Sequence, residues 1–83
     1  MTEEQAISWI AEILDQPADQ LRAETPRDEI PMWDSLGVLM LIAAYDEKFG
    51  IELADADMRQ MRKVDDLLEI LRREGKLQQP SPA

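Results

Sequence analysis

Neither cysteine nor histidine occurs among the 83 residues of this chain. Without cysteine the fold cannot use disulfides or a thiolate metal cluster, so the core must form by apolar packing. The absence of histidine removes the usual general base, and the absence of cysteine removes the most reactive nucleophile. Carboxylates, hydroxyls, one tyrosine, lysines and arginines are left. An enzyme is possible with these groups but poorly equipped, so we expect a protein without catalysis of its own.

Glycine and aromatic residues are also scarce, with three glycines and 5% aromatic residues. Hydrophobic residues make up 45% of the chain, and most of them are Leu, Ile, Met and Ala. Together with the many Glu and Asp residues, this composition favours helices over strands. The length suits one domain near the lower limit for folding without a covalent staple. We expect a single all-α domain.

Positive charge is outnumbered two to one, because nine Lys and Arg stand against eighteen Asp and Glu, for a net charge of −9. Such an acidic surface disfavours nucleic acid and anionic membranes and suits basic protein surfaces, although solubility alone would also explain it. The first residues, MTEEQAISW, are acidic where a secretory signal would be basic, and no apolar run reaches membrane-spanning length. We expect a cytoplasmic monomer without a membrane or nucleic-acid partner.

Four segments carry the apolar periodicity and the end signals of helices. Their expected bounds are 2–16, 35–49, 55–61 and 64–74. We expect Pro17 to end the first helix, and Gly50 and Gly75 to close the second and the last. Asp55 is expected to cap the short third helix. These four helices would form one domain at 1–75, followed by a flexible tail at 76–83.

The connection at 16–33 holds three prolines and no sustained periodicity. One short turn at 18–22 would place Leu21 on the core. Irregular connections of this length are uncommon in small domains and are usually functional. We therefore expect a structured loop that has a role in function.

The helix expected at 35–49 is apolar on two opposite sides. The core side would hold Val38, Leu41, Ile42, Tyr45 and Phe49. Leu36, Leu39 and Met40 lie on the other side. A helix that is apolar all round is either fully buried or offers its second face to a partner, and a domain this small can hardly bury it completely. The second face is thus a candidate docking patch, unless the loop at 16–33 covers it.

The segment 33–37, Trp-Asp-Ser-Leu-Gly, resembles the phosphopantetheine attachment motif of acyl carrier proteins, whose core is Asp-Ser-Leu. Alone, such a pair of polar residues is a common helix N-cap. The surrounding pattern agrees with the family: a long loop before the serine, an acidic and aromatic helix end at 45–51, a short third helix at 53–61, and then Val64. The resemblance implies a four-helix bundle with a long loop between helices one and two.

The resemblance implies that Ser35 carries a 4′-phosphopantetheine arm derived from coenzyme A, whose thiol holds an acyl group as a thioester. It implies that Asp34 caps the helix beside the arm and that Leu36 inserts into partner enzymes. The implied docking residues are Leu36, Leu39, Met40, Asp46 and Glu47. The implied partners are a Mg²⁺-dependent phosphopantetheinyl transferase, a loading ligase or acyltransferase, and a downstream synthase.

Two positions depart from the carriers of general fatty acid synthesis, which have acidic residues where Gly37 and Met40 stand. The docking face would be more apolar than usual, while Arg62 and Lys63 add positive charge between the last two helices. Because charge complementarity tunes encounter and specificity, we hypothesise a carrier for a specialised pathway. Gly37→Asp with Met40→Glu should then improve recognition by general fatty-acid enzymes.

Two alternatives stay open. An aminoacyl or peptidyl carrier shares the fold and the arm, although its usual glycine-rich lead into the serine is replaced here by 31–33, Pro-Met-Trp. A small helical adaptor that docks through Leu36 and Met40, and is never modified, belongs to a different class. Tyr45 on the core side would narrow an internal acyl pocket, which fits short or polar cargo.

Overall fold

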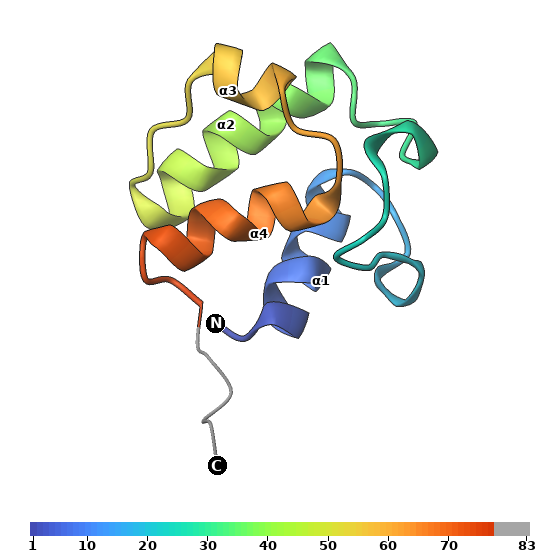
Figure 1. Cartoon of the computed structure of the whole chain (residues 1–83), viewed down its shortest axis with the longest axis horizontal. Helices are drawn as coiled ribbons and strands as arrows, with labels where there is room; N and C mark the ends of the chain where they lie inside the picture. The colour runs from blue at the N-terminus through green and yellow to red at the C-terminus, as the bar shows by residue number, and fades with distance from the viewer. Residues whose placement is uncertain (78–83) are drawn as a thin grey trace.

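A computed structural model describes residues 1–77 of the chain. The elements in this part are α1 (Glu3–Ile13), η1 (Ala18–Gln20), η2 (Arg27–Glu29), α2 (Ser35–Phe49), α3 (Asp55–Arg59) and α4 (Val64–Arg73). The two η elements are single turns of 3₁₀ helix within the long connection between α1 and α2 (Figure 1). The architecture confirms the prediction of an all-α four-helix bundle with a long first loop and a short third helix.

Helix α1 begins as predicted but ends earlier than predicted. Thr2 is its N-cap, and its hydroxyl accepts a hydrogen bond from a backbone N–H of the first turn. The helix stops at Ile13, so Pro17 does not end it. The chain leaves the helix because Asp15 takes the left-handed conformation, with φ of 54°.

Helix α2 has the predicted bounds, and Gly50 closes it in the left-handed conformation with φ of 67°. The prediction for α3 is wrong in two respects, because the helix ends at Arg59 instead of Met61 and its N-cap is not Asp55. Ala54 is the N-cap and makes no side-chain hydrogen bond, while Asp55 is the first helical residue. Asp55 instead pairs with Arg59 one turn later, at 2.8 Å. Met58 within α3 and Met61 shortly after it are both buried.

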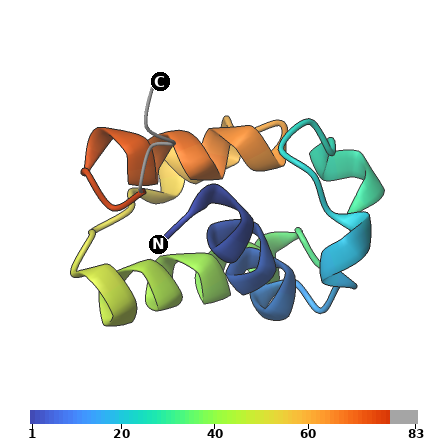
Figure 2. The same ribbon diagram turned by 90° about the horizontal axis from the view of Figure 1, so that it is seen from below.

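The core lies where α1 packs against both α2 and α4, while α3 packs against α2 (Figures 1 and 2). The largest fully buried side chains come from all four helices: Ile10, Leu14, Leu41, Tyr45, Met58, Val64, Leu67, Leu68 and Leu71. The apolar sides of α2 and α4 therefore face the same interior. No helix in residues 1–77 is long and apolar enough to cross a membrane.

The long loop is ordered against the amino end of α4, and in Figures 1 and 2 it occupies one end of the molecule. Its residues Leu21 and Ile30 are buried, which confirms the predicted docking of Leu21. Backbone carbonyls of the loop accept hydrogen bonds from the N–H groups of Val64 and Asp65, at 3.0 and 2.7 Å. These bonds satisfy donors that the first turn of a helix cannot satisfy internally.

Arg72 ties the beginning of the chain to the last helix. Its guanidinium contacts carboxylates of Glu3 on α1 and of Asp65 and Glu69 on α4, at 2.6 to 3.0 Å. Leu77 is half-buried and packs against the core. The remainder of the tail expected at 76–83 lies outside the described residues.

Candidate functional site

Ser35 is the first residue of α2 and is exposed. The preceding Asp34 is the N-cap, as predicted, and its carboxylate accepts a hydrogen bond from the Gly37 N–H at 3.1 Å. Trp33, one residue earlier, is buried with only 3% of its surface exposed. The motif is thus anchored by its tryptophan and capped by its aspartate, which leaves the serine hydroxyl facing solvent at a rigid helix start.

Arg27 holds this anchor in place from within the long loop. Its guanidinium lies over the Trp33 ring at 5.4 Å, and its Nε donates to the Trp33 carbonyl at 3.1 Å. Its Nη1 donates to the carbonyls of Met58 and Met61, at 3.2 and 3.4 Å. One side chain therefore joins the loop, the first residue of the motif, α3 and the segment just after α3. The sequence does not reveal this role, because the bonds to the Met58 and Met61 carbonyls span 31 and 34 residues and no local pattern signals them.

Gly37 is buried and does not lie on the exposed apolar face of α2. A Cβ at this position would overlap the backbone carbonyl of Met32 and crowd the side chain of Leu14. The glycine is therefore required for the loop to lie against the first turn of α2. The interpretation of Gly37 as a missing acidic contact is wrong, and so is the expectation that Gly37→Asp would improve recognition, since this site has no room for the larger side chain.

The second apolar face of α2 is open to solvent. Leu36, Leu39 and Met40 are 57%, 60% and 38% exposed, and they are the large exposed hydrophobic residues of the described part of the chain. The alternative interpretation, in which the loop at 16–33 covers this face, is wrong because the loop packs on the Gly37 side of α2 and on the amino end of α4, which leaves the three side chains exposed. We refer to these three side chains as the apolar patch.

The acidic residues expected to share this surface lie at the far end of the helix. Asp46 and Glu47 are exposed, but they stand eleven and twelve residues after Ser35. At 1.5 Å per residue, that places them about 17 Å along the helix axis from the serine. The structure brings Leu36, Leu39 and Met40 together beside Ser35 but leaves the two carboxylates apart from them.

A groove beside the serine runs between α2 and α3. Its lining residues are Arg27, Ser35, Val38, Leu39, Asp55 and Arg59. An exposed hydroxyl that opens onto such a groove fits the attachment of an extended prosthetic arm, because neither the loop nor α3 closes the approach to Ser35. The groove combines an apolar wall with charged side chains, which sequence analysis did not predict.

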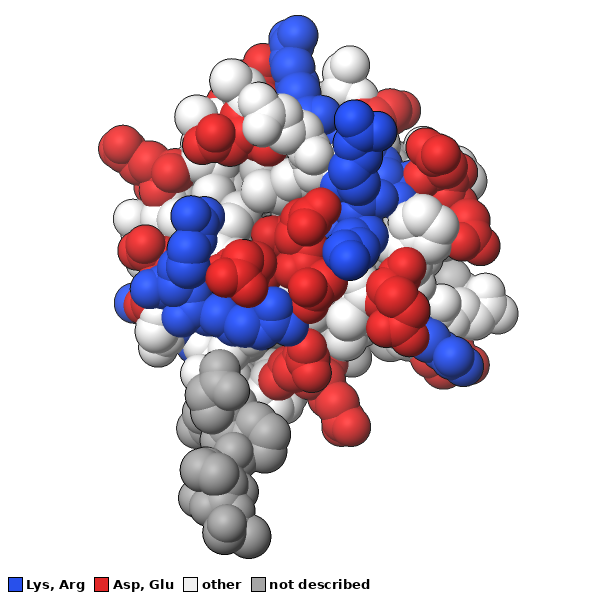
Figure 3. Space-filling view, viewed as in Figure 1, with Lys and Arg blue, Asp and Glu red and all other residues white. Residues whose placement is uncertain are grey.

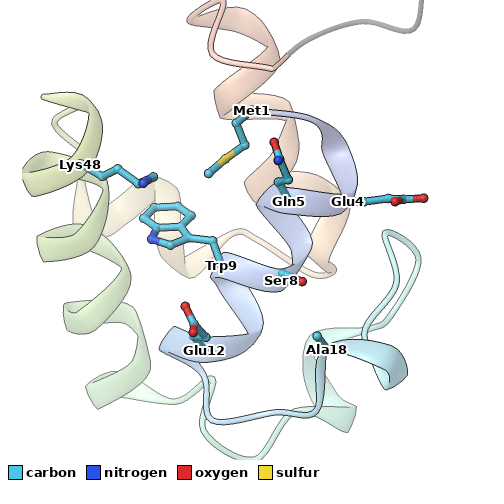
Figure 4. A pocket seen from close by; sticks show the side chains of 8 residues that line it. All are labelled: Met1, Glu4, Gln5, Ser8, Trp9, Glu12, Ala18 and Lys48. Atoms are coloured by element: carbon cyan, nitrogen blue, oxygen red, sulfur yellow. The ribbon is translucent and has the colours of Figure 1, made fainter.

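A second hollow, on the α1 side of the molecule, is explained by the packing of side chains around Trp9. Its lining residues are Met1, Glu4, Gln5, Ser8, Trp9, Glu12, Ala18 and Lys48 (Figure 4). Trp9 is half-buried, and its ring lies 5.2 Å from those of Tyr45 and Phe49. Lys48 reaches over the Trp9 ring at 5.9 Å (Figure 4). Ser8 offers an exposed hydroxyl here, but it lies within α1 and beside no apolar patch.

Comparison with known proteins gives a consistent result, although no family model matches the chain. An acyl carrier protein of Campylobacter jejuni subsp. doylei is 36% identical over 62 residues, which cover 75% of this chain and 80% of that protein. An acyl carrier protein of Bdellovibrio bacteriovorus is 31% identical over 67 residues, which cover 81% and 86%. A shorter match, 42% over 38 residues, joins the chain to an acyl carrier protein of Solidesulfovibrio magneticus.

The fold, the exposed serine at the start of α2 and the apolar patch beside it define a small helical carrier domain. The relatives span most of the chain and most of their own length at more than 30% identity. The chain belongs to the acyl carrier protein family.

Proposed function

We propose that this protein holds acyl groups as thioesters on a 4′-phosphopantetheine arm attached to Ser35 and delivers them to partner enzymes. The observation that carries the proposal is the exposed Ser35 hydroxyl at a capped helix start, between the apolar patch and an open groove. Membership of the acyl carrier protein family supports the same role. We further propose that the protein acts as a cytoplasmic monomer.

Ser35 is the substrate of the modification and not its catalyst. Its Oγ forms a bond to the β-phosphorus of coenzyme A, the bond to the adenosine 3′,5′-bisphosphate leaving group breaks, and a base of the transferase takes the hydroxyl proton. The free N–H groups of the first turn of α2 favour the resulting anion by about 0.3–1 kcal/mol. When attached, the arm supplies a thiol, and the chain has no cysteine to compete for the cargo.

The apolar patch is the proposed docking surface for the transferase, for a loading ligase or acyltransferase, and for a downstream synthase. No charged residue occurs in the ten positions between Ser35 and Asp46. On the face seen in Figure 3, Lys and Arg lie among Asp and Glu instead of leaving one acidic surface. Both features favour partners that bind mainly through apolar contact, and hence a carrier of a specialised pathway.

The core favours short or polar cargo that stays outside the bundle. Tyr45 is completely buried, and its hydroxyl donates to the Leu67 carbonyl of α4 at 2.8 Å. This bond fixes a large side chain between α2 and α4, where an internal acyl pocket would need room. An aminoacyl group is therefore a second candidate cargo, on the same arm and the same serine.

Intact mass measurement tests the proposal. The purified chain is incubated with coenzyme A, Mg²⁺ and a broad-specificity phosphopantetheinyl transferase. We expect the wild type and the control variant Ser8→Ala to gain one arm, and Ser35→Ala to gain none. A wild type of unchanged mass would favour the unmodified adaptor instead.

A further inference from the structure

The groove beside Ser35 holds a guanidinium that no carboxylate of the described residues pairs with. Arg27 is half-buried, and all three of its side-chain hydrogen bonds go to backbone carbonyls. None of the ion pairs within residues 1–77 includes it, and its Nη2 has no hydrogen-bond partner in that part of the chain. A partly buried positive charge that is balanced only by peptide dipoles and by the face of the Trp33 ring favours a nearby anion.

Arg59 brings a second guanidinium to the same groove from α3. Its Nε contacts the Asp55 carboxylate at 2.8 Å, but the two side chains are 76% and 55% exposed. Exposed pairs of this kind contribute little to stability because water screens them. The two terminal nitrogens of Arg59 have no hydrogen-bond partner within residues 1–77 and can therefore bind another anion.

We propose that Arg27 and Arg59 form an anion subsite for the phosphodiester that joins the arm to Ser35. This inference rests on the proposed function. Ser35 lines the groove together with both arginines, so attachment brings the phosphate into the groove. A phosphodiester has one negative charge and two non-bridging oxygens, which match the forked N–H donors of a guanidinium. Asp55 is the competing anion in the groove.

The test compares the folding equilibrium constants of the apo and the arm-bearing protein. Both constants are measured by urea denaturation in phosphate-free buffer at low salt. The folding constant of the arm-bearing protein divided by that of the apo protein reports how much the attached phosphate stabilises the fold. We expect a ratio of about two- to fivefold for the wild type, which is the range of exposed ion pairs. Raising the salt to about 1 M, where the Debye length is about 3 Å, should lower this ratio.

Variants of the groove should move the ratio in opposite directions. Arg59→Gln and Arg27→Gln should lower it, because each removes a donor to the phosphate. Asp55→Asn should raise it, because it removes the competing carboxylate. Arg73→Gln is the matched control, since Arg73 is exposed in the last turn of α4 and does not line the groove. Comparing apo and arm-bearing forms within each variant cancels any general loss of stability.

The ³¹P resonance of the phosphodiester is an independent readout. It should shift in Arg59→Gln and stay in place in Arg73→Gln. Equal ratios in all variants, with an unmoved resonance, would overturn the subsite while leaving the arm on Ser35. If the mass shows that Ser35 takes no arm at all, the proposed function fails and the subsite fails with it.

Discussion

Gly37 lets the long loop lie against the first turn of α2, and this close approach fixes the position of Ser35. Helical glycine is normally a weakness, because it costs about 1 kcal/mol relative to alanine. Here the absence of a side chain leaves room for the carbonyl of Met32. Close contact with the loop explains both the glycine and the burial of Trp33 next to the serine.

Gly37→Ala should therefore destabilise the protein despite the better helix propensity of alanine. The added methyl group must displace backbone, and overpacking of this kind costs about 1–3 kcal/mol. The free energy of unfolding, from urea denaturation followed by tryptophan fluorescence, checks this. Met40→Ala, on the exposed side of the same helix, should change it by less than about 0.5 kcal/mol. A variant Gly37→Ala as stable as the wild type would contradict the close packing.

Burial raises the pKa of the Tyr45 phenol well above its usual value of about 10. The folded chain then keeps the proton at pH values where the unfolded chain has released it. The stabilisation is complete below about pH 10 and falls as the pH rises further, by up to about 1.4 kcal/mol per unit. Urea denaturation at about pH 9 and pH 11 should show a larger loss for the wild type than for Tyr45→Phe. Equal losses would argue against this assignment.

Two faces of α2 have different tasks at the scale of the element. Val38, Leu41 and Tyr45 hold the helix on the core, while the apolar patch stays exposed. Residues of the core and residues of the apolar patch, which is the proposed docking surface, can therefore be changed independently. The helix periodicity alone predicts both faces, because the pattern repeats locally along the chain.

Leu36→Ala with Leu39→Ala should weaken docking without weakening the fold. Since both side chains are largely exposed, the free energy of unfolding should change by less than about 0.5 kcal/mol. The kcat/KM of arm transfer to Ser35 should fall about five- to thirtyfold, as expected for the loss of central apolar contacts. Ser8→Ala should leave kcat/KM unchanged. An unaltered rate in the double variant would remove the patch from the docking surface.

Of the two substitutions proposed from the sequence, Gly37→Asp and Met40→Glu, only the second has room in the structure. Met40 is partly exposed, so the charge can reach solvent without entering the core. If the protein serves a specialised pathway, the variant should gain activity with general fatty-acid synthesis enzymes, measured as the rate of cargo transfer. No gain, or a loss, would count against a specialised carrier.

At the scale of the whole molecule, most features that the sequence could not reveal are contacts between residues far apart in the chain. The bounds of α2, the capping role of Asp34 and the cap at Gly50 depend on residues within one or two turns, and local patterns predict them. Arg27 instead acts on carbonyls more than thirty residues away. Arg72 reaches Glu3 at the opposite end of the described chain. Such pairings follow from the tertiary fold and leave no periodic signal.

The same limit applies to the candidate site. The motif identifies Ser35, and the second apolar face predicts the exposed patch. To predict the groove, one would need to know that α3 packs against α2 and brings Arg59 and Asp55 into the same groove as the serine. The role of Gly37 required the path of the loop. Site residues that belong to one segment could be predicted from the sequence. A groove formed by three separate segments could not.

The most direct test of the account is the mass of the protein isolated from its native host, before and after mild treatment with hydroxylamine, which cleaves thioesters. We predict that the protein carries a phosphopantetheine arm on the peptide that contains Ser35, and that hydroxylamine releases an acyl or aminoacyl group from part of the sample. A protein that carries no arm, or carries it on a peptide without Ser35, would contradict the account.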